Sequence, residues 1–137
     1  MVVFPHQFSH RVRFRECDPM EIAYHVHYLD WFEYARTEAL REAGVPYKSL
    51  SDSGITLPVI DLGIKYKKSV LYDDVITVET TPELSESGMR LTCKYEILRG
   101  TESMAVGHVT LCFLQEGKTR PIPAPSSVRS ALQRISD

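Results

Sequence analysis

Polar and apolar residues alternate along residues 8–15. One face of this segment would carry Phe8, His10, Val12 and Phe14, and the other face Ser9, Arg11, Arg13 and Arg15. A period of two with one polar face is typical of a half-buried β-strand, because successive side chains point to opposite sides. Pro19 then interrupts the strand pattern, since proline has no backbone N–H to donate to a neighbouring strand. The chain is therefore expected to open with a strand and a turn.

The pattern becomes helical over residues 25–43. Apolar residues recur three or four positions apart, which places on one face Tyr28, Phe32, Ala35, Ala39 and Ala43. Gly44 is suited to cap the carboxyl end, and Pro46 prevents continuation. Trp31 and Tyr34 add apolar surface outside this face, which indicates burial inside a wrapped sheet or at a contact between subunits.

The rest of the chain predicts four strands and a short final helix. Residues 47–55 are expected to be a connecting segment, and the strands to span residues 57–68, 74–84, 89–99 and 102–115. Residues 85–88 and 100–101 are the expected hairpin turns, because glycine tolerates the positive φ that such turns require. Ser126 or Ser127 is expected to cap a helix that runs to Ile135. One long helix followed by antiparallel strands is an α+β pattern.

Composition narrows the class of protein. The 137 residues are expected to form a single domain, 1–137, and 43% hydrophobic with 25% charged residues is typical of a soluble globular protein. The net charge of −2 favours neither nucleic acid nor an anionic membrane as a partner. We expect no secretory signal and no membrane-spanning segment, since the amino terminus lacks an apolar run after a basic start and all apolar stretches are short.

Three widely spaced cysteines fit neither a disulfide framework nor a cysteine-rich zinc site: Cys17, Cys93 and Cys112. A reducing cytoplasm is therefore the expected location.

Asp18 lies between the first strand and the long helix and has two interpretations. It can be a helix N-cap or turn residue, which the local spacing by itself favours. It can also be a carboxylate held ionised near the amino end of the helix, where the dipole favours negative charge. There it could attack a carbonyl carbon or activate a water, while backbone amides near Tyr24 and His25 polarise the carbonyl.

His25 and His27 raise the possibility of a metal site. Residues two apart on a helix point in different directions, and the usual ligand spacings are absent, so we expect no metal. His25 is instead expected to line a pocket, and His27 to pack or hydrogen-bond in the first turn. No glycine-rich phosphate loop and no Gly-x-Ser-x-Gly elbow occurs.

Charged residues elsewhere leave two alternatives each. Glu33 and Arg36 are three apart on the helix and could form a surface ion pair, although Glu33 could also reach a pocket. The lysines at the end of the first of the four later strands could form a solvated face or contact phosphates: Lys65, Lys67 and Lys68.

Three blocks of sequence, in order, resemble the 4-hydroxybenzoyl-CoA thioesterase family, and its YbgC-like acyl-CoA thioesterase branch in particular. The first block is Cys17-Asp18-Pro19, then Tyr24-His25-x-His27-Tyr28-Leu29, then Phe32-Glu33-x-Ala35-Arg36-Thr37-Glu38. The second runs from Leu71 to Thr80, and the third is Lys118-Thr-Arg-Pro-Ile-Pro123. The resemblance covers roughly residues 8–128.

The resemblance implies a hotdog fold, in which a long central helix is wrapped by a five-stranded antiparallel sheet and subunits form dimers and commonly tetramers. It implies hydrolysis of an acyl-CoA thioester without a metal or organic cofactor. Asp18 would be the catalytic base or nucleophile, and His25 would contribute its ring and a carbonyl-polarising amide. Partner-subunit strands around residues 60–69 would complete the pocket. Further substrate contacts are expected from Tyr24, Glu33, Lys68, Ser69 and Arg90.

Two positions depart from the family pattern. Glu21 stands where family members usually have glycine, and it would alter the turn or add charge near the thioester. The hairpin of residues 85–90 offers only Arg90 where hydroxybenzoyl-type enzymes carry a basic cluster, which favours the acyl-CoA branch. The alternatives to acyl-CoA hydrolysis are a hotdog module that binds acyl-CoA or an acyl-carrier protein without turnover, another hotdog enzyme such as a hydratase, and a thioesterase for an aromatic CoA ester.

Overall fold

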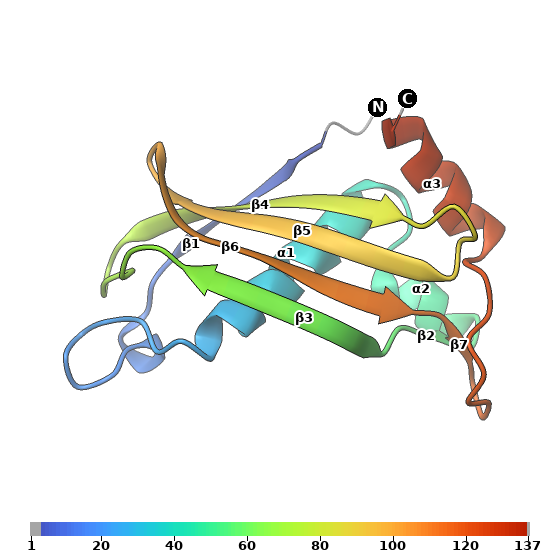
Figure 1. The fold of residues 1–137 in the computed structure, drawn as a ribbon, viewed down its shortest axis with the longest axis horizontal. Helices are drawn as coiled ribbons and strands as arrows, with labels where there is room; N and C mark the ends of the chain where they lie inside the picture. The colour runs from blue at the N-terminus through green and yellow to red at the C-terminus, as the bar shows by residue number, and fades with distance from the viewer. Residues whose placement is uncertain (1–3, 137) are drawn as a thin grey trace.

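The computed structural model describes residues 4–136, so the first three positions of the amino terminus, where no secretory signal is expected, lie outside the described residues. The centre of the fold is a five-stranded antiparallel sheet in the order β1-β4-β5-β6-β3. Its strands are β1 (His6–Arg11), β3 (Val59–Tyr66), β4 (Val75–Leu84), β5 (Arg90–Arg99) and β6 (Glu102–Cys112). Helix α1 (His27–Glu42) crosses one face of this sheet (Figure 1). The predicted α+β class and the hotdog arrangement of helix and sheet are confirmed.

The core lies between α1 and the sheet. The alternating positions of β4 and β5 point buried side chains at the helix, as their two-residue burial pattern shows. Phe32 stacks on Tyr95 with ring centroids 4.1 Å apart. Gly107 allows this close approach, because a Cβ there would lie 2.7 Å from the Phe32 ring and 2.8 Å from the carbonyl oxygen of Gly63. The helix face predicted from the sequence is therefore the packed face.

Two expectations for α1 need correction or refinement. Arg36 is buried, and its Nη1 donates to the Tyr95 hydroxyl at 3.2 Å, so the surface ion pair with Glu33 does not form. Trp31 is 2% exposed, whereas Tyr34 remains 56% exposed and stacks on Phe8. Of the two apolar side chains outside the main face, Trp31 is therefore part of the core and Tyr34 lies on the surface.

The first predicted strand is too long. β1 ends at Arg11, and the chain turns into a short 3-10 helix, η1 (Phe14–Glu16). Phe14 was expected on the buried face, but it is 68% exposed because the turn breaks the two-residue alternation. Glu16 takes the buried position instead.

Further differences lie at the opposite end of the sheet. The expected connecting segment contains helix α2 (Tyr47–Asp52), which begins directly after Pro46. The last predicted strand is divided into β6 and the short strand β7 (Leu114–Gln115). β7 pairs with another short strand, β2 (Ile55–Thr56), which lies at the end of the expected connecting segment and outside the main sheet. Helix α3 (Ser126–Ser136) closes the chain, close to its predicted position. Among the described residues, no helix has the length and apolar character needed to cross a bilayer.

Candidate active site

Asp18 lies in a tight hairpin between η1 and α1. The Asp18 amide donates to the carbonyl of Ile22, and the Glu21 amide donates to the carbonyl of Asp18, both at 2.9 Å. The carboxylate oxygen Oδ1 accepts from the amides of Met20 and Ile22, at 2.8 and 3.4 Å. Pro19 supplies the preset φ that suits the second position of such a turn. The hairpin therefore orients the carboxylate through its own backbone.

The hairpin engages only one of the two carboxylate oxygens. The N-cap position of α1 is Val26, so Asp18 is a turn aspartate and not the helix cap. Among residues 4–136, no hydrogen-bond donor contacts Oδ2 of Asp18, and the side chain forms part of a pocket wall. A carboxylate with one oxygen held and the other open is oriented and still available to a ligand.

Glu21 completes the three-residue loop of the hairpin with a φ of 64°. Three-residue hairpin loops commonly need a left-handed residue at this place, and glycine adopts that conformation without a clash at Cβ. A residue with a side chain costs about 1–2 kcal/mol more in this conformation. Glutamate at position 21 is therefore a source of backbone strain.

A buried carboxylate, Glu16, anchors the base of the hairpin. Its oxygens accept hydrogen bonds from the Arg13 amide at 2.7 Å and from the indole of Trp31 at 2.8 Å. A ring nitrogen of His10 lies 2.8 Å from the same carboxylate. Glu16 ends η1, and its partners lie on β1, on α1 and at the residue before η1, so one side chain joins three elements. The sequence analysis did not single out Glu16, although position 16 is the next in the series 8, 10, 12 and 14 that was predicted to face the core.

The environment of Glu16 favours its charged form. Burial by itself raises the pKa of this carboxyl. The Arg13 amide, the Trp31 indole and the His10 ring outweigh burial, and together they leave the pKa of Glu16 below its ordinary value. The charged carboxylate is thus part of the folded structure at neutral pH.

At the amino end of α1, the amides of His25 and Val26 have no acceptor among the described residues, and of these two residues His25 lines the pocket. The Tyr24 amide donates to the carbonyl of Glu16 at 2.8 Å, so it is not available to polarise a substrate carbonyl. Of the two amides expected near the thioester, only that of His25 can act as an oxyanion contact.

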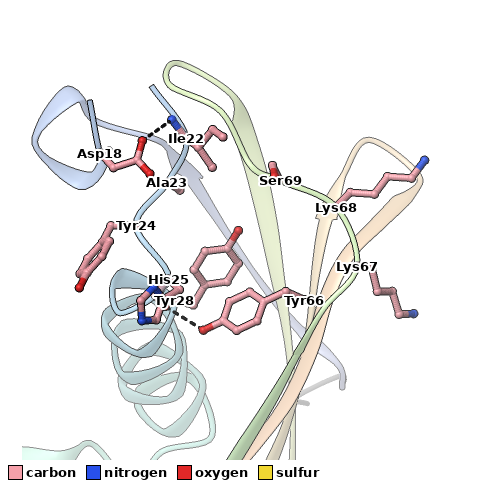
Figure 2. A pocket seen from close by; sticks show the side chains of 10 residues that line it. All are labelled: Asp18, Ile22, Ala23, Tyr24, His25, Tyr28, Tyr66, Lys67, Lys68 and Ser69. Carbon is pink, nitrogen blue, oxygen red and sulfur yellow. Dashed lines mark hydrogen bonds between the residues drawn. The ribbon is translucent and has the colours of Figure 1, made fainter. Parts of the chain in front are cut away.

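Figure 2 shows the pocket between the Asp18 hairpin, the amino end of α1 and the end of β3. Its volume is about 400 Å³, and its wall includes Asp18, Tyr24, His25 and Ser69. The Tyr66 hydroxyl donates to the His25 carbonyl at 2.9 Å. With Lys68, which also lines this pocket, the structure thus brings together five of the predicted site residues.

The segment after β3 forms the opposite rim. It is held to the returning arm of the hairpin, because the Ala23 amide donates to the carbonyl of Val70 at 2.8 Å. Lys68 also lines the pocket, and its ammonium forms an ion pair with Glu102. Lys67 Nζ donates to the Ser103 hydroxyl at 3.3 Å. A phosphate that approached Lys68 would have to compete with Glu102 for its charge.

Two predicted substrate contacts lie elsewhere in the subunit. Arg90 begins β5, and the site lies beside the other end of that ten-residue strand, about 30 Å away in extended chain (Figure 1). Glu33 is exposed on α1 and does not line the pocket. One subunit by itself therefore does not gather Arg90 and Glu33 around Asp18.

The two histidines separate as expected. His25 lines the pocket, whereas Nδ1 of His27 lies 2.9 Å from a carboxylate oxygen of Asp30 in the first turn of the helix. Within the described part of the chain, no three His, Cys, Asp or Glu side chains are grouped closely enough to hold a metal ion.

Comparison with known proteins shows what this chain is similar to. Residues 12–132 match the model of the thioesterase-like superfamily. The acyl-CoA thioesterase YbgC of Haemophilus influenzae is 30% identical over 130 residues, which cover 93% of this chain and 94% of that protein. A DHNA-CoA thioesterase structure from Staphylococcus aureus superposes with a TM-score of 0.89 at 29% identity, covering 98% of this chain and 92% of that one. The crystal structure of a hypothetical protein from Aquifex aeolicus superposes with a TM-score of 0.87 at 31% identity, and the match covers 93% of this chain and 99% of that one.

We predict that Glu16→Gln lowers the free energy of unfolding at pH 7 by roughly 1.5–3 kcal/mol, since hydrogen bonds to a charged group are lost or weakened. A carboxyl with a lowered folded-state pKa stabilises the fold above its unfolded pKa, about 4.3, and loses this contribution as pH falls through the folded pKa. The deficit of Glu16→Gln, measured by urea unfolding, should therefore shrink below about pH 4. Glu86→Gln, at an exposed turn position, serves as the control. A deficit independent of pH would contradict the charge argument.

We predict that Glu21→Gly raises the free energy of unfolding by about 1 kcal/mol, because it relieves the strain of a positive φ. Glu21→Ala removes the charge but keeps a Cβ, so it should give no comparable gain. Urea unfolding of the three proteins separates the two causes. An equal gain in the alanine variant would show that charge, and not backbone strain, is responsible.

Proposed function

The chain belongs to the thioesterase-like superfamily, a family of thioester hydrolases, and from that premise we propose that it hydrolyses an acyl-CoA ester to free CoA and a carboxylic acid. One observation carries the proposal. Asp18, which has one open carboxylate oxygen, and His25, which has a free amide, line the same pocket. A thioester carbon between them would meet a carboxylate and a carbonyl-polarising donor together.

The proposed chemistry has two possible forms. As a general base, Asp18 takes a proton from water while the water oxygen attacks the thioester carbon, the carbon–sulfur bond breaks and CoA leaves as thiolate. As a nucleophile, Asp18 forms a mixed anhydride with release of CoA thiolate, and water then hydrolyses the anhydride. In both forms the His25 amide stabilises the charge that develops on the carbonyl oxygen.

We predict that Asp18→Asn lowers kcat for CoA release by about 100- to 10,000-fold, the usual contribution of a positioned proton-transfer group. Asparagine keeps a side-chain oxygen for the Met20 and Ile22 amides, so the hairpin should persist. The assay measures thiol release from a panel of alkanoyl-CoA and aroyl-CoA esters. Asp52→Asn, on the exposed end of α2, is the matched control.

The possible outcomes divide the functional alternatives. Full activity of Asp18→Asn would remove Asp18 from the chemistry. An inactive wild-type chain that still binds CoA esters would leave the non-catalytic binding module. Turnover in water labelled with heavy oxygen distinguishes the two mechanisms, because only the nucleophilic route can deposit label in the Asp18 carboxylate.

We also propose that two copies associate through β3. This strand is paired with β6 on one side only, which leaves its other edge open. The strand and its end carry large apolar side chains that are nearly half exposed: Val59, Ile60, Leu62 and Tyr66. Antiparallel pairing of β3 with its copy would cover these groups and bring partner residues to the pocket, which already contains the end of β3. Pairs of such dimers would give the tetramer expected of this family.

We predict that Leu62→Lys shifts the particle mass toward the single-chain value of 15.6 kDa, because a charge at the unpaired strand would be buried on association. Light scattering on the unchanged chain should give two or four times that mass. Val75→Lys, at an equally exposed position on β4, should leave the mass unchanged. A monomeric wild-type chain would overturn the β3 interface.

We also propose that the protein is located in the cytoplasm. All three cysteines are free, as expected of a reducing compartment: Cys17, Cys93 and Cys112. Fractionation of cells that make the protein tests this location.

A further inference from the structure

Tyr66 links the edge strand β3 to the amino end of α1. It is the last residue of the strand, and its hydroxyl donates to the His25 carbonyl at 2.9 Å (Figure 2). The helix itself holds this carbonyl weakly, because the Tyr28 amide is 3.4 Å away. The hydroxyl of Tyr66 is therefore the stronger of the two groups that bind the carbonyl of residue 25.

The ring of Tyr66 is held independently of its hydroxyl. It meets the ring of Tyr28 edge-on at a centroid distance of 4.8 Å and the ring of His25 at 6.4 Å, with interplanar angles of 79° and 90°. Edge-to-face contacts at these distances are favourable. Burial raises the pKa of Tyr66, so the hydroxyl keeps its proton and remains a donor across the neutral pH range.

The bond acts on the residue that carries the free amide. A hydrogen bond to the His25 carbonyl restrains rotation of that peptide unit, and it also draws electron density from the His25–Val26 peptide group. The preceding peptide is held in the same way, since the Tyr24 carbonyl accepts from the His27 amide at 3.0 Å. With both of these carbonyls bonded, the backbone on each side of the His25 α-carbon is restrained, and with it the direction of the His25 amide.

We propose that Tyr66 is a positioning residue for hydrolysis: its hydroxyl fixes the His25 backbone so that the His25 amide is preorganised toward the thioester oxygen. This inference rests on the proposed function and adds a residue to it, one contributed by the strand at the open edge of the sheet. Tyr66 acts through the backbone of residue 25 and does not need to touch the reacting atoms.

We predict that Tyr66→Phe lowers kcat for the best CoA ester roughly tenfold with KM changed less than twofold. This is smaller than the 100- to 1,000-fold that loss of an oxyanion donor itself costs, because the His25 amide remains but is less well held. Phenylalanine retains the ring contacts with Tyr28. Tyr34→Phe is the control, since it deletes an exposed tyrosine hydroxyl outside the site, and it should leave kcat unchanged.

A second measurement reports the hydrogen bond without turnover. The amide nitrogen of Val26 is bonded to the His25 carbonyl carbon, so loss of the Tyr66 hydroxyl should move its NMR resonance to lower frequency. The control variant should leave that resonance in place. An unshifted Val26 resonance with undiminished kcat in Tyr66→Phe would overturn the inference while the proposed function stands. A wild-type chain inactive on every ester would overturn the proposed function and this inference with it.

Discussion

The buried carboxylate of Glu16 is the interaction on which the geometry of the site depends. Its side chain receives hydrogen bonds from the backbone before η1 and from Trp31 on α1, and its ring partner His10 comes from β1. Its carbonyl receives the Tyr24 amide, just after the Asp18 hairpin. Both ends of the hairpin are therefore attached to one residue. A polar network of this kind specifies a single arrangement only because every donor in it is satisfied.

The chemistry of the site depends on which backbone amides near Glu16 already have an acceptor and which do not. The amides of Asp18, Glu21 and Tyr24 each donate to a backbone carbonyl. The amides of His25 and Val26 have no acceptor among the described residues, as expected at the start of a helix. Of these two residues, His25 lines the pocket. The pocket thus gains an anion-binding donor from the ordinary geometry of a helix start, while the hairpin brings a carboxylate to the same space.

The edge strand β3 contributes both to the proposed association of two copies and to the site. β3 has one unpaired edge, and its last residue, Tyr66, bonds the backbone of His25. If a second copy pairs along β3, as proposed, the position of Tyr66 becomes sensitive to that pairing. The oxyanion contact would then be best formed in the assembled protein, which gives a physical reason for a site at a subunit boundary.

The sequence by itself determined the elements whose periodicity was unbroken: the long helix with its Phe32 face, the β4–β6 meander with its turns, and the place of Asp18 before the helix. It did not predict where the first strand would turn, so Phe14 was expected inside and Glu16 was overlooked. Only the tertiary structure decided that Asp18 has one oxygen held and one open, that the His25 amide is free and the Tyr24 amide is not, and that Arg90 lies at the far end of the sheet. The physical reason is that periodicity reports which face of an element is buried, whereas hydrogen-bond pairing between distant segments depends on how the elements meet.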